Sequence, residues 1–151
     1  MITKAIQEIH PKTQGDGKTP FHLAAEEGHV EVCAMFFGLP GFQNIKDENG
    51  DTPFHWAAKK GHIKVCKLML IKLEFTEPRN DFLEKPLHFA AAYNFLDIFR
   101  LLFDENEACA RSKDQHGITP TERAIQRNNS EIIRYIQDRK IMDENKFNSF
   151  L

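Results

Sequence analysis

The chain has 151 residues, a mass of 17.5 kDa and a formal net charge of -2 at pH 7. This length suits one compact domain or a short solenoid, and 41% hydrophobic with 28% charged residues is typical of a folded globular chain. There is no excess of basic residues and no apolar run near the ~20 residues that a membrane-spanning helix requires, so we expect no nucleic-acid partner and no direct membrane insertion. No signal-peptide pattern follows Met1, which favours a cytoplasmic or nuclear location.

The N-terminal segment, residues 1–15, predicts half of a helical unit. Ile2, Ala5, Ile6 and Ile9 follow the spacing of one helix face, and they align only with the back half of the repeat that follows. A helix of about ten residues, roughly 15 Å long, covers only part of the N-terminal side of an array. The segment is therefore interpreted as a partial repeat or N-cap, and the chain as either a fragment of a longer array or a protein with an abbreviated cap.

A unit of about 33 residues then repeats along the chain. Its clearest segment occupies residues 19–25, 52–58 and 85–91 at a constant spacing, and a related segment follows at 119–124 after a slightly longer interval. A fixed period in this range predicts a repeat solenoid. The predicted boundaries are 16–48 for repeat 1, 49–81 for repeat 2, 82–115 for repeat 3, 116–140 for a C-terminal capping repeat and 141–151 for a tail.

Each unit has the pattern of two short helices. Proline follows Thr19 at the first helical position, where its missing N–H costs nothing, and the threonine hydroxyl caps the helix. Gly28 and Gly61 supply the left-handed residue that ends the first helix, and Asn94 and Asn128 fill this place in the later units. The second helix of each unit carries an apolar face, which predicts a core shared along the array.

The Thr-Pro-Phe-His-x-Ala-Ala segments, followed by Gly-His, resemble the ankyrin-repeat family, and the resemblance covers more than four-fifths of the chain. It implies an all-α ankyrin-repeat solenoid of helix-turn-helix units joined by β-hairpin-like turns. It also implies a protein–protein interaction module that binds a partner protein or peptide through its concave groove and hairpin tips, with no catalysis and no cofactor. The alternative is a regulatory or targeting fragment of a larger enzyme, channel or effector protein.

Histidine and cysteine recur with the repeat, which argues against a catalytic or metal site. The resemblance implies that His22, His55 and His88 each bond to a capping residue and to the neighbouring turn. His29 and Cys33 stand four residues apart, as in half of a zinc site or a nucleophilic pair, but the same pair returns one period later. A feature that repeats with the fold is explained by the fold, so we predict no catalytic, cofactor-binding or metal-binding residue.

The side chains that break the repeat are the candidates for partner binding. By resemblance, two positions in each unit face the concave groove. One is the variable position of the repeated segment, and the other stands just before the end of the first helix. These candidates are Leu23, Glu27, Trp56, Lys60, Phe89, Tyr93 and Arg123. Aromatic side chains ringed by charges match the anatomy of a binding hot spot. The alternatives are that Trp56 and Phe89 pad the contact between helices and that the charges form a solvated face.

Phe82 and Leu83 complete the set of candidate binding residues, because they stand where the other turns have a residue followed by glycine. Leucine does not adopt a positive φ easily, so we expect this turn to depart from the usual hairpin. Two interpretations stay open for the apolar pair, a contact with a partner and an inward tuck. The chain is expected to be a monomer or to associate end to end through its N-terminal face.

Overall fold

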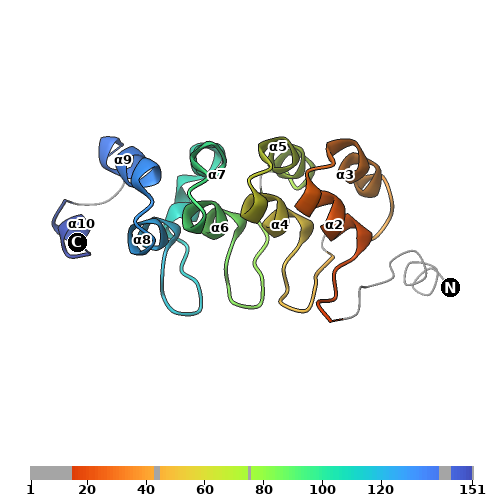
Figure 1. Cartoon of the computed structure of the whole chain (residues 1–151), viewed down its shortest axis with the longest axis horizontal. Helices are drawn as coiled ribbons and strands as arrows, with labels where there is room; N and C mark the ends of the chain where they lie inside the picture. Colours follow the sequence, from red (N-terminus) through yellow and green to blue (C-terminus); the bar gives the residue numbers. More distant parts are fainter. Residues whose placement is uncertain (1–14, 43–44, 75, 140–143, 151) are drawn as a thin grey trace.

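The computed structural model describes residues 15–42, 45–74, 76–139 and 144–150. Within these residues the fold is all-α, in agreement with the predicted ankyrin solenoid. Two rows of helices run the length of the molecule, and hairpin-like turns project from one side of them (Figure 1). No helix among the described residues is long and apolar enough to cross a membrane.

The first helices of the units are α2 (Pro20–Glu27), α4 (Pro53–Lys60), α6 (Pro86–Ala92) and α8 (Pro120–Gln126). The second helices are α3 (Val30–Phe37), α5 (Ile63–Lys72), α7 (Leu96–Glu105) and α9 (Ser130–Asp138). A 3-10 helix, η1 (Glu107–Arg111), follows α7, and α10 (Glu144–Asn148) lies at the C-terminal end. The turns are called hairpin 1 (residues 15–18), hairpin 2 (47–51), hairpin 3 (80–84) and hairpin 4 (114–118).

The ends of the first helices follow the predicted chemistry. Thr19 stands before α2 in an extended conformation, and its N–H donates to His22 Nδ1 at 3.1 Å. Gly28 ends the helix with a φ of 79°, and Asn94 and Asn128 have φ values of 61° and 54° at the equivalent places. Asparagine therefore replaces glycine as the left-handed residue in the later units, as the sequence predicted.

The core is a continuous layer between the two rows of helices. Each first helix packs on the first helix of the next unit, and each second helix on the next second helix. Alanines such as Ala57, Ala58 and Ala90 are fully buried in the first helices, and their small side chains allow neighbouring helices to approach closely. Larger side chains such as Phe54 and Ile98 fill the layer between the rows.

Equivalent positions of the second helices differ in exposure along the array. Val32 is 41% exposed in repeat 1, whereas the equivalent Val65, Ile98 and Ile132 are 0% exposed because a preceding unit packs on them. Residues 1–14, which hold most of the predicted N-terminal partial repeat, lie outside the described residues. At the other end, Phe147 of α10 is buried.

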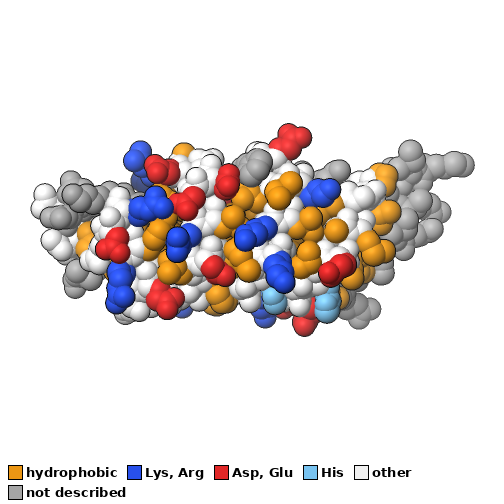
Figure 2. Space-filling model, turned by 90° about the horizontal axis from the view of Figure 1, so that it is seen from above, with side chains coloured by type: hydrophobic (Ala, Val, Ile, Leu, Met, Phe, Trp, Pro, Cys, Tyr) orange, Lys and Arg blue, Asp and Glu red, His pale blue; other side chains and the backbone are white. Residues whose placement is uncertain are grey.

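The outer face of the second helices is mixed in character. Figure 2 shows hydrophobic side chains there among Lys, Arg, Asp and Glu. Met35 and Ile71 are the most exposed large hydrophobic residues in the described part of the chain.

Candidate partner-binding surface

Hairpins 2, 3 and 4 share one set of hydrogen bonds. Asp47 Oδ1 accepts from the backbone N–H groups of Asn49 and Asp51, both at 2.9 Å. Asn80 Oδ1 and Asp114 Oδ1 accept from the equivalent pairs of N–H groups in hairpins 3 and 4. A side-chain oxygen bonded to the backbone two residues on is the mechanism by which Asp and Asn favour turns. The three turns therefore have one backbone design.

Hairpin 3 keeps this design although leucine replaces glycine. The φ of Leu83 is 61°, against 67° at Gly17, 73° at Gly50 and 76° at Gly117. The prediction that this turn departs from the usual hairpin is wrong, because the Asn80 side chain and a 3.1 Å bond from Leu83 N–H to Asn80 O hold the leucine in the left-handed region. That region costs a residue with a Cβ roughly 1–2 kcal/mol.

Adjacent hairpins are joined through their backbones. Glu48 N–H donates to Asp16 O, and Asp81 N–H donates to Asn49 O, both at 3.1 Å. The same bond joins hairpin 4 to hairpin 3, where Phe82 O is the acceptor at 2.9 Å. The hairpins thus form one ladder with fixed spacing, and side chains at their tips are held in a regular row.

Two histidines of the first helices, His22 and His55, bond to the neighbouring turn as predicted. His22 Nε2 lies 2.8 Å from Asp51 O, and His55 Nε2 lies 3.0 Å from Glu84 O, so each ring joins its helix to the next hairpin. For His88, Nδ1 accepts the Lys85 N–H at 3.0 Å, but Nε2 has no hydrogen-bond partner among the described residues. Burial lowers the pKa of His55 and of His88 to about 4, which keeps both rings neutral near neutral pH. A neutral ring buried between a helix and a turn has no access to a substrate.

The second histidine–cysteine pair also has a structural explanation. His62 Nε2 lies 2.8 Å from Glu26 O in the preceding unit, and its ring covers Gly28 so closely that a Cβ there would overlap it. Burial raises the pKa of Cys33 to about 11 and that of Cys66 well above its ordinary value. The thiols are therefore protonated and poor nucleophiles.

The sequence did not predict that the side chain at the variable position of the repeated segment binds the hairpin that precedes it in the chain. The Trp56 indole N–H donates to Asp47 Oδ2 at 2.9 Å, and the Arg123 guanidinium donates to Asp114 Oδ2 nine residues earlier in the same relation. Arg123 also lies 3.3 Å from Glu84. Both side chains are therefore partly structural. The nine-residue separation between each of them and the aspartate of its turn was the sequence feature that could have predicted this contact.

Trp56 lies in a cluster of charged residues. Lys18 Nζ lies 3.5 Å and Lys59 Nζ 4.6 Å from the indole centroid, within the range of cation–π attraction. Glu26 joins Lys18 at 2.7 Å to Lys60 at 3.2 Å. Partial burial would raise the pKa of Glu26, but the bonds from these two lysines lower it below its ordinary value. Most of the charged groups around the indole thus already interact with other groups of the chain.

The remaining candidates differ in exposure. Tyr93 is 51% and Leu23 40% exposed, and Glu27 and Lys60 are also exposed. Phe89 is partly buried with its ring edge-on to His55, at a centroid distance of 5.8 Å. The structure brings Phe89 close to Trp56 through Lys59, which also lies 5.8 Å from the Phe89 ring.

Phe82 and Leu83, which we call the tip patch, are 40% and 47% exposed. Their backbones are bonded within the ladder, and both residues are partly exposed. Neither side chain is therefore fully tucked into the core.

Lys85 replaces the capping threonine of the other units and binds elsewhere. Its Nζ lies 3.1 Å from Cys109 Sγ in η1, the element that lengthens the third repeat. Glu77 completes the cluster by accepting the Leu87 N–H at 2.9 Å, and burial raises the pKa of this carboxyl. The cluster joins α6 to η1. Among the described residues, no group of His, Cys, Asp and Glu has the geometry to hold a metal ion.

The stacked helix pairs, left-handed caps and projecting turns define a helical solenoid with a regular hairpin ladder. A family model described as ankyrin repeats (3 copies) matches residues 1–78 and 70–148, and the chain belongs to the ankyrin-repeat family. Members of this family generally act as protein–protein interaction modules and are typically without catalytic activity. No curated protein matches the chain.

Proposed function

We propose that the chain binds a protein or peptide partner and has no catalytic role. The contact surface in this proposal is the tip patch together with the exposed groove residues Leu23, Lys60 and Tyr93. Trp56, Phe89 and Arg123 contribute less to binding than the sequence suggested, because each is partly buried by contacts within the chain.

The observation that carries the proposal is the conformation of Leu83. A bulky residue stands in the left-handed region where three other hairpins have glycine, and its side chain is 47% exposed. The fold gains little apolar burial in return for a strained backbone. Strain retained at an exposed position is typical of a site that acts on another molecule.

A substitution of Leu83 separates binding from folding. Leu83→Gly relieves the strain but increases the entropy of the unfolded chain, so the free energy of unfolding in urea should change by no more than about 1 kcal/mol. Peptides enriched from a random 12-residue display library on the wild-type chain should bind Leu83→Gly at least tenfold more weakly.

The matched control is Ile71→Ala, which removes an exposed aliphatic side chain from the outer face of α5. It should leave the affinity of the enriched peptides within twofold. Equal binding to wild type and to Leu83→Gly, or a library that yields no peptide, contradicts the proposal.

The exposure of Val32 supports the second candidate function, a targeting or regulatory part of a larger assembly. Val32 is 41% exposed at a position that is fully buried in every later unit, so this face is shaped to receive a neighbour. Association with a partner protein or with a second copy should bury Val32. Hydrogen exchange of the α3 amides measures self-association, and exchange that stays unchanged across protein concentrations excludes a second copy as the neighbour.

A further inference from the structure

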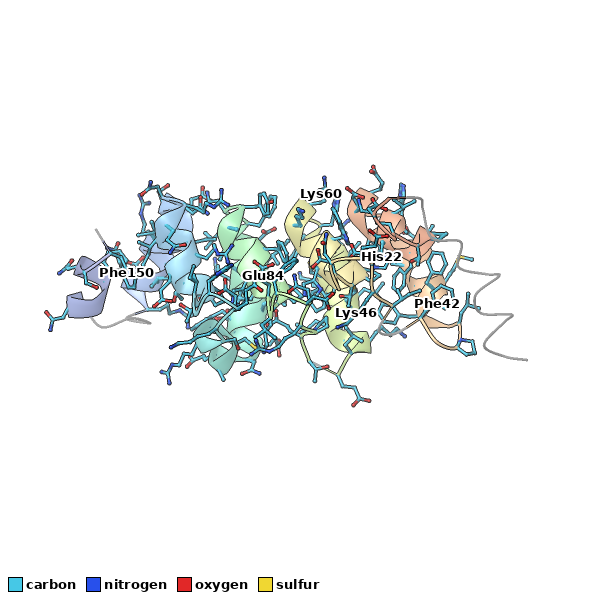
Figure 3. All side chains as sticks on the ribbon, turned by 90° about the horizontal axis from the view of Figure 1, so that it is seen from below. His22, Phe42, Lys46, Lys60, Glu84 and Phe150 are labelled. Atoms are coloured by element: carbon cyan, nitrogen blue, oxygen red, sulfur yellow. The ribbon has the colours of Figure 1, made fainter. Side chains whose placement is uncertain are left out.

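Three basic residues occupy the same place in three consecutive repeats. Lys46, Arg79 and Lys113 each stand immediately before a hairpin, namely hairpins 2, 3 and 4, and all three are exposed. We call them the basic row. Figure 3 looks onto the hairpin side of the molecule and labels Lys46 there, with Lys60 at a different edge.

The basic row binds backbone carbonyls and not carboxylates. Lys46 Nζ donates to Arg79 O at 3.1 Å, and Arg79 Nη1 donates to Lys113 O at 3.1 Å and to Leu83 O at 2.9 Å. In the described part of the chain, the ion pairs involve other cations, namely Lys18, Lys60, Arg123 and Arg139. No carboxylate of the described residues forms an ion pair with the basic row, and Arg79 connects the row to the tip patch through Leu83 O.

The acidic residues of the turns lie over the preceding hairpins. Glu48 packs on Gly17 and Asp81 on Gly50, so closely that a Cβ on either glycine would overlap them. At the next step of the ladder, neutral Gln115 takes the acidic place and Leu83 takes the glycine place. The step from hairpin 3 to hairpin 4 is thus where a neutral residue replaces the acidic one and an apolar residue replaces the glycine.

We propose that the tip patch and the basic row together bind an extended, acidic peptide segment with an apolar anchor. This inference rests on the proposed function and adds the class of partner. The apolar side chain of the segment lies on Phe82 and Leu83, and carboxylates on either side of it pair with Lys46 and Lys113. Charges at the rim of such a contact select the partner and its orientation, while the apolar anchor holds it.

The distance between repeats determines how far apart the acidic residues of the bound segment should be. Packed helices of neighbouring units stand about 10 Å apart, and an extended chain advances about 3.3 Å per residue, so one repeat corresponds to about three partner residues. Lys46 and Lys113 are two repeats apart. The segment should therefore carry two acidic residues about six positions apart, with a leucine, phenylalanine or similar residue midway.

Two display libraries of 12-residue peptides test this class of partner. One fixes glutamate at two positions six residues apart, the other fixes lysine at the same positions, and all other positions are random. Mixed in equal amounts and selected on the wild-type chain, the glutamate library should supply at least ten times more enriched peptides, with apolar residues concentrated midway.

Charge reversal of the row identifies the site. Lys46→Glu with Lys113→Glu should weaken the enriched peptides at least tenfold by fluorescence anisotropy, and binding should also weaken with added salt. The control is Lys64→Glu with Lys67→Glu, a matched reversal of two exposed lysines on α5, which should stay within twofold. Circular dichroism checks that both variants remain folded.

The outcomes separate the two proposals. Equal enrichment from both libraries, or no effect of reversing the row, overturns the acidic partner. If the enriched peptides still bind Leu83→Gly more weakly than wild type, the tip patch is a binding site that does not select its partner by charge. Peptides that respond to neither change, or the absence of any enriched peptide, overturn both proposals.

Discussion

Hairpins 2 and 3 have the same backbone and different attachments to the helix that follows. In hairpin 2, the second oxygen of Asp47 accepts from Trp56, so turn and helix are joined within one unit. In hairpin 3, Asn80 donates instead to Asp51 at 2.8 Å and to Glu84 at 3.0 Å, because Phe89 offers no polar group. Hairpin 3 is thus attached backward, to its predecessor.

The comparison shows how a repeat accommodates a change without a change of fold. The side-chain bonds that hold the turn need one oxygen at the first position, which Asp and Asn both supply. The other polar atom of that side chain can form a hydrogen bond with whichever group the unit provides.

The largest expected effect comes from cutting the link between the two hairpins. His55 is 1% exposed and joins Thr52 in its own unit to Glu84 O in the next. His55→Ala leaves a cavity and an unpaired carbonyl, and the free energy of unfolding should fall by about 3 kcal/mol in urea titration. The exposed His116→Ala serves as the control, with a change below about 0.5 kcal/mol. A similar small loss in both variants would show that the hairpins are held by their backbones alone.

A smaller effect is expected from the charge at the junction. Burial raises the pKa of Asp51 to about 6, and because this is above its unfolded value, proton uptake stabilises the folded chain. That contribution is fully present below about pH 4 and is lost as the pH rises through 6. Wild type should therefore gain about 2 kcal/mol relative to Asp51→Asn between pH 7 and pH 4.

Urea titrations at both pH values measure this difference. His55 and His88, with pKa values lowered to about 4, work in the opposite direction but are present in both proteins and cancel. A wild-type to Asp51→Asn difference that stays constant with pH would show that Asp51 is not desolvated as the structure indicates.

The smallest effect concerns the attachment that hairpin 3 lacks. Trp56→Phe removes the bond to Asp47 and makes unit 2 resemble unit 3, so stability should fall by about 1 kcal/mol. Phe89→Trp is the reciprocal change, and it should add no such bond because the equivalent atom of hairpin 3 is the Asn80 amide nitrogen, which donates and cannot accept from an indole N–H. Thermal unfolding of both variants checks this, and a loss from Phe89→Trp as large as that from Trp56→Phe would mean that ring size and not the hydrogen bond decides.

The sequence predicted the helices and their ends well, because these depend on local chemistry. Proline at the first helical position, glycine or asparagine at the end and an apolar face are visible within a single unit. The candidate surface was predicted less well. Trp56 and Arg123 looked like free groove residues, and only their contacts with Asp47 and Asp114 show that part of each side chain serves the fold.

By itself, the sequence determined the period, the fold and the place where the repeat changes, since each follows from residue types at fixed spacing. The tertiary structure decided which of the changed residues remain available to a partner. Leu83 illustrates the limit: its intrinsic preference argued for a different turn, but the Asn80 bonds and the ladder to hairpin 4 outweigh a cost of roughly 1–2 kcal/mol. Such a balance depends on contacts between units, and no local pattern within one unit contains them.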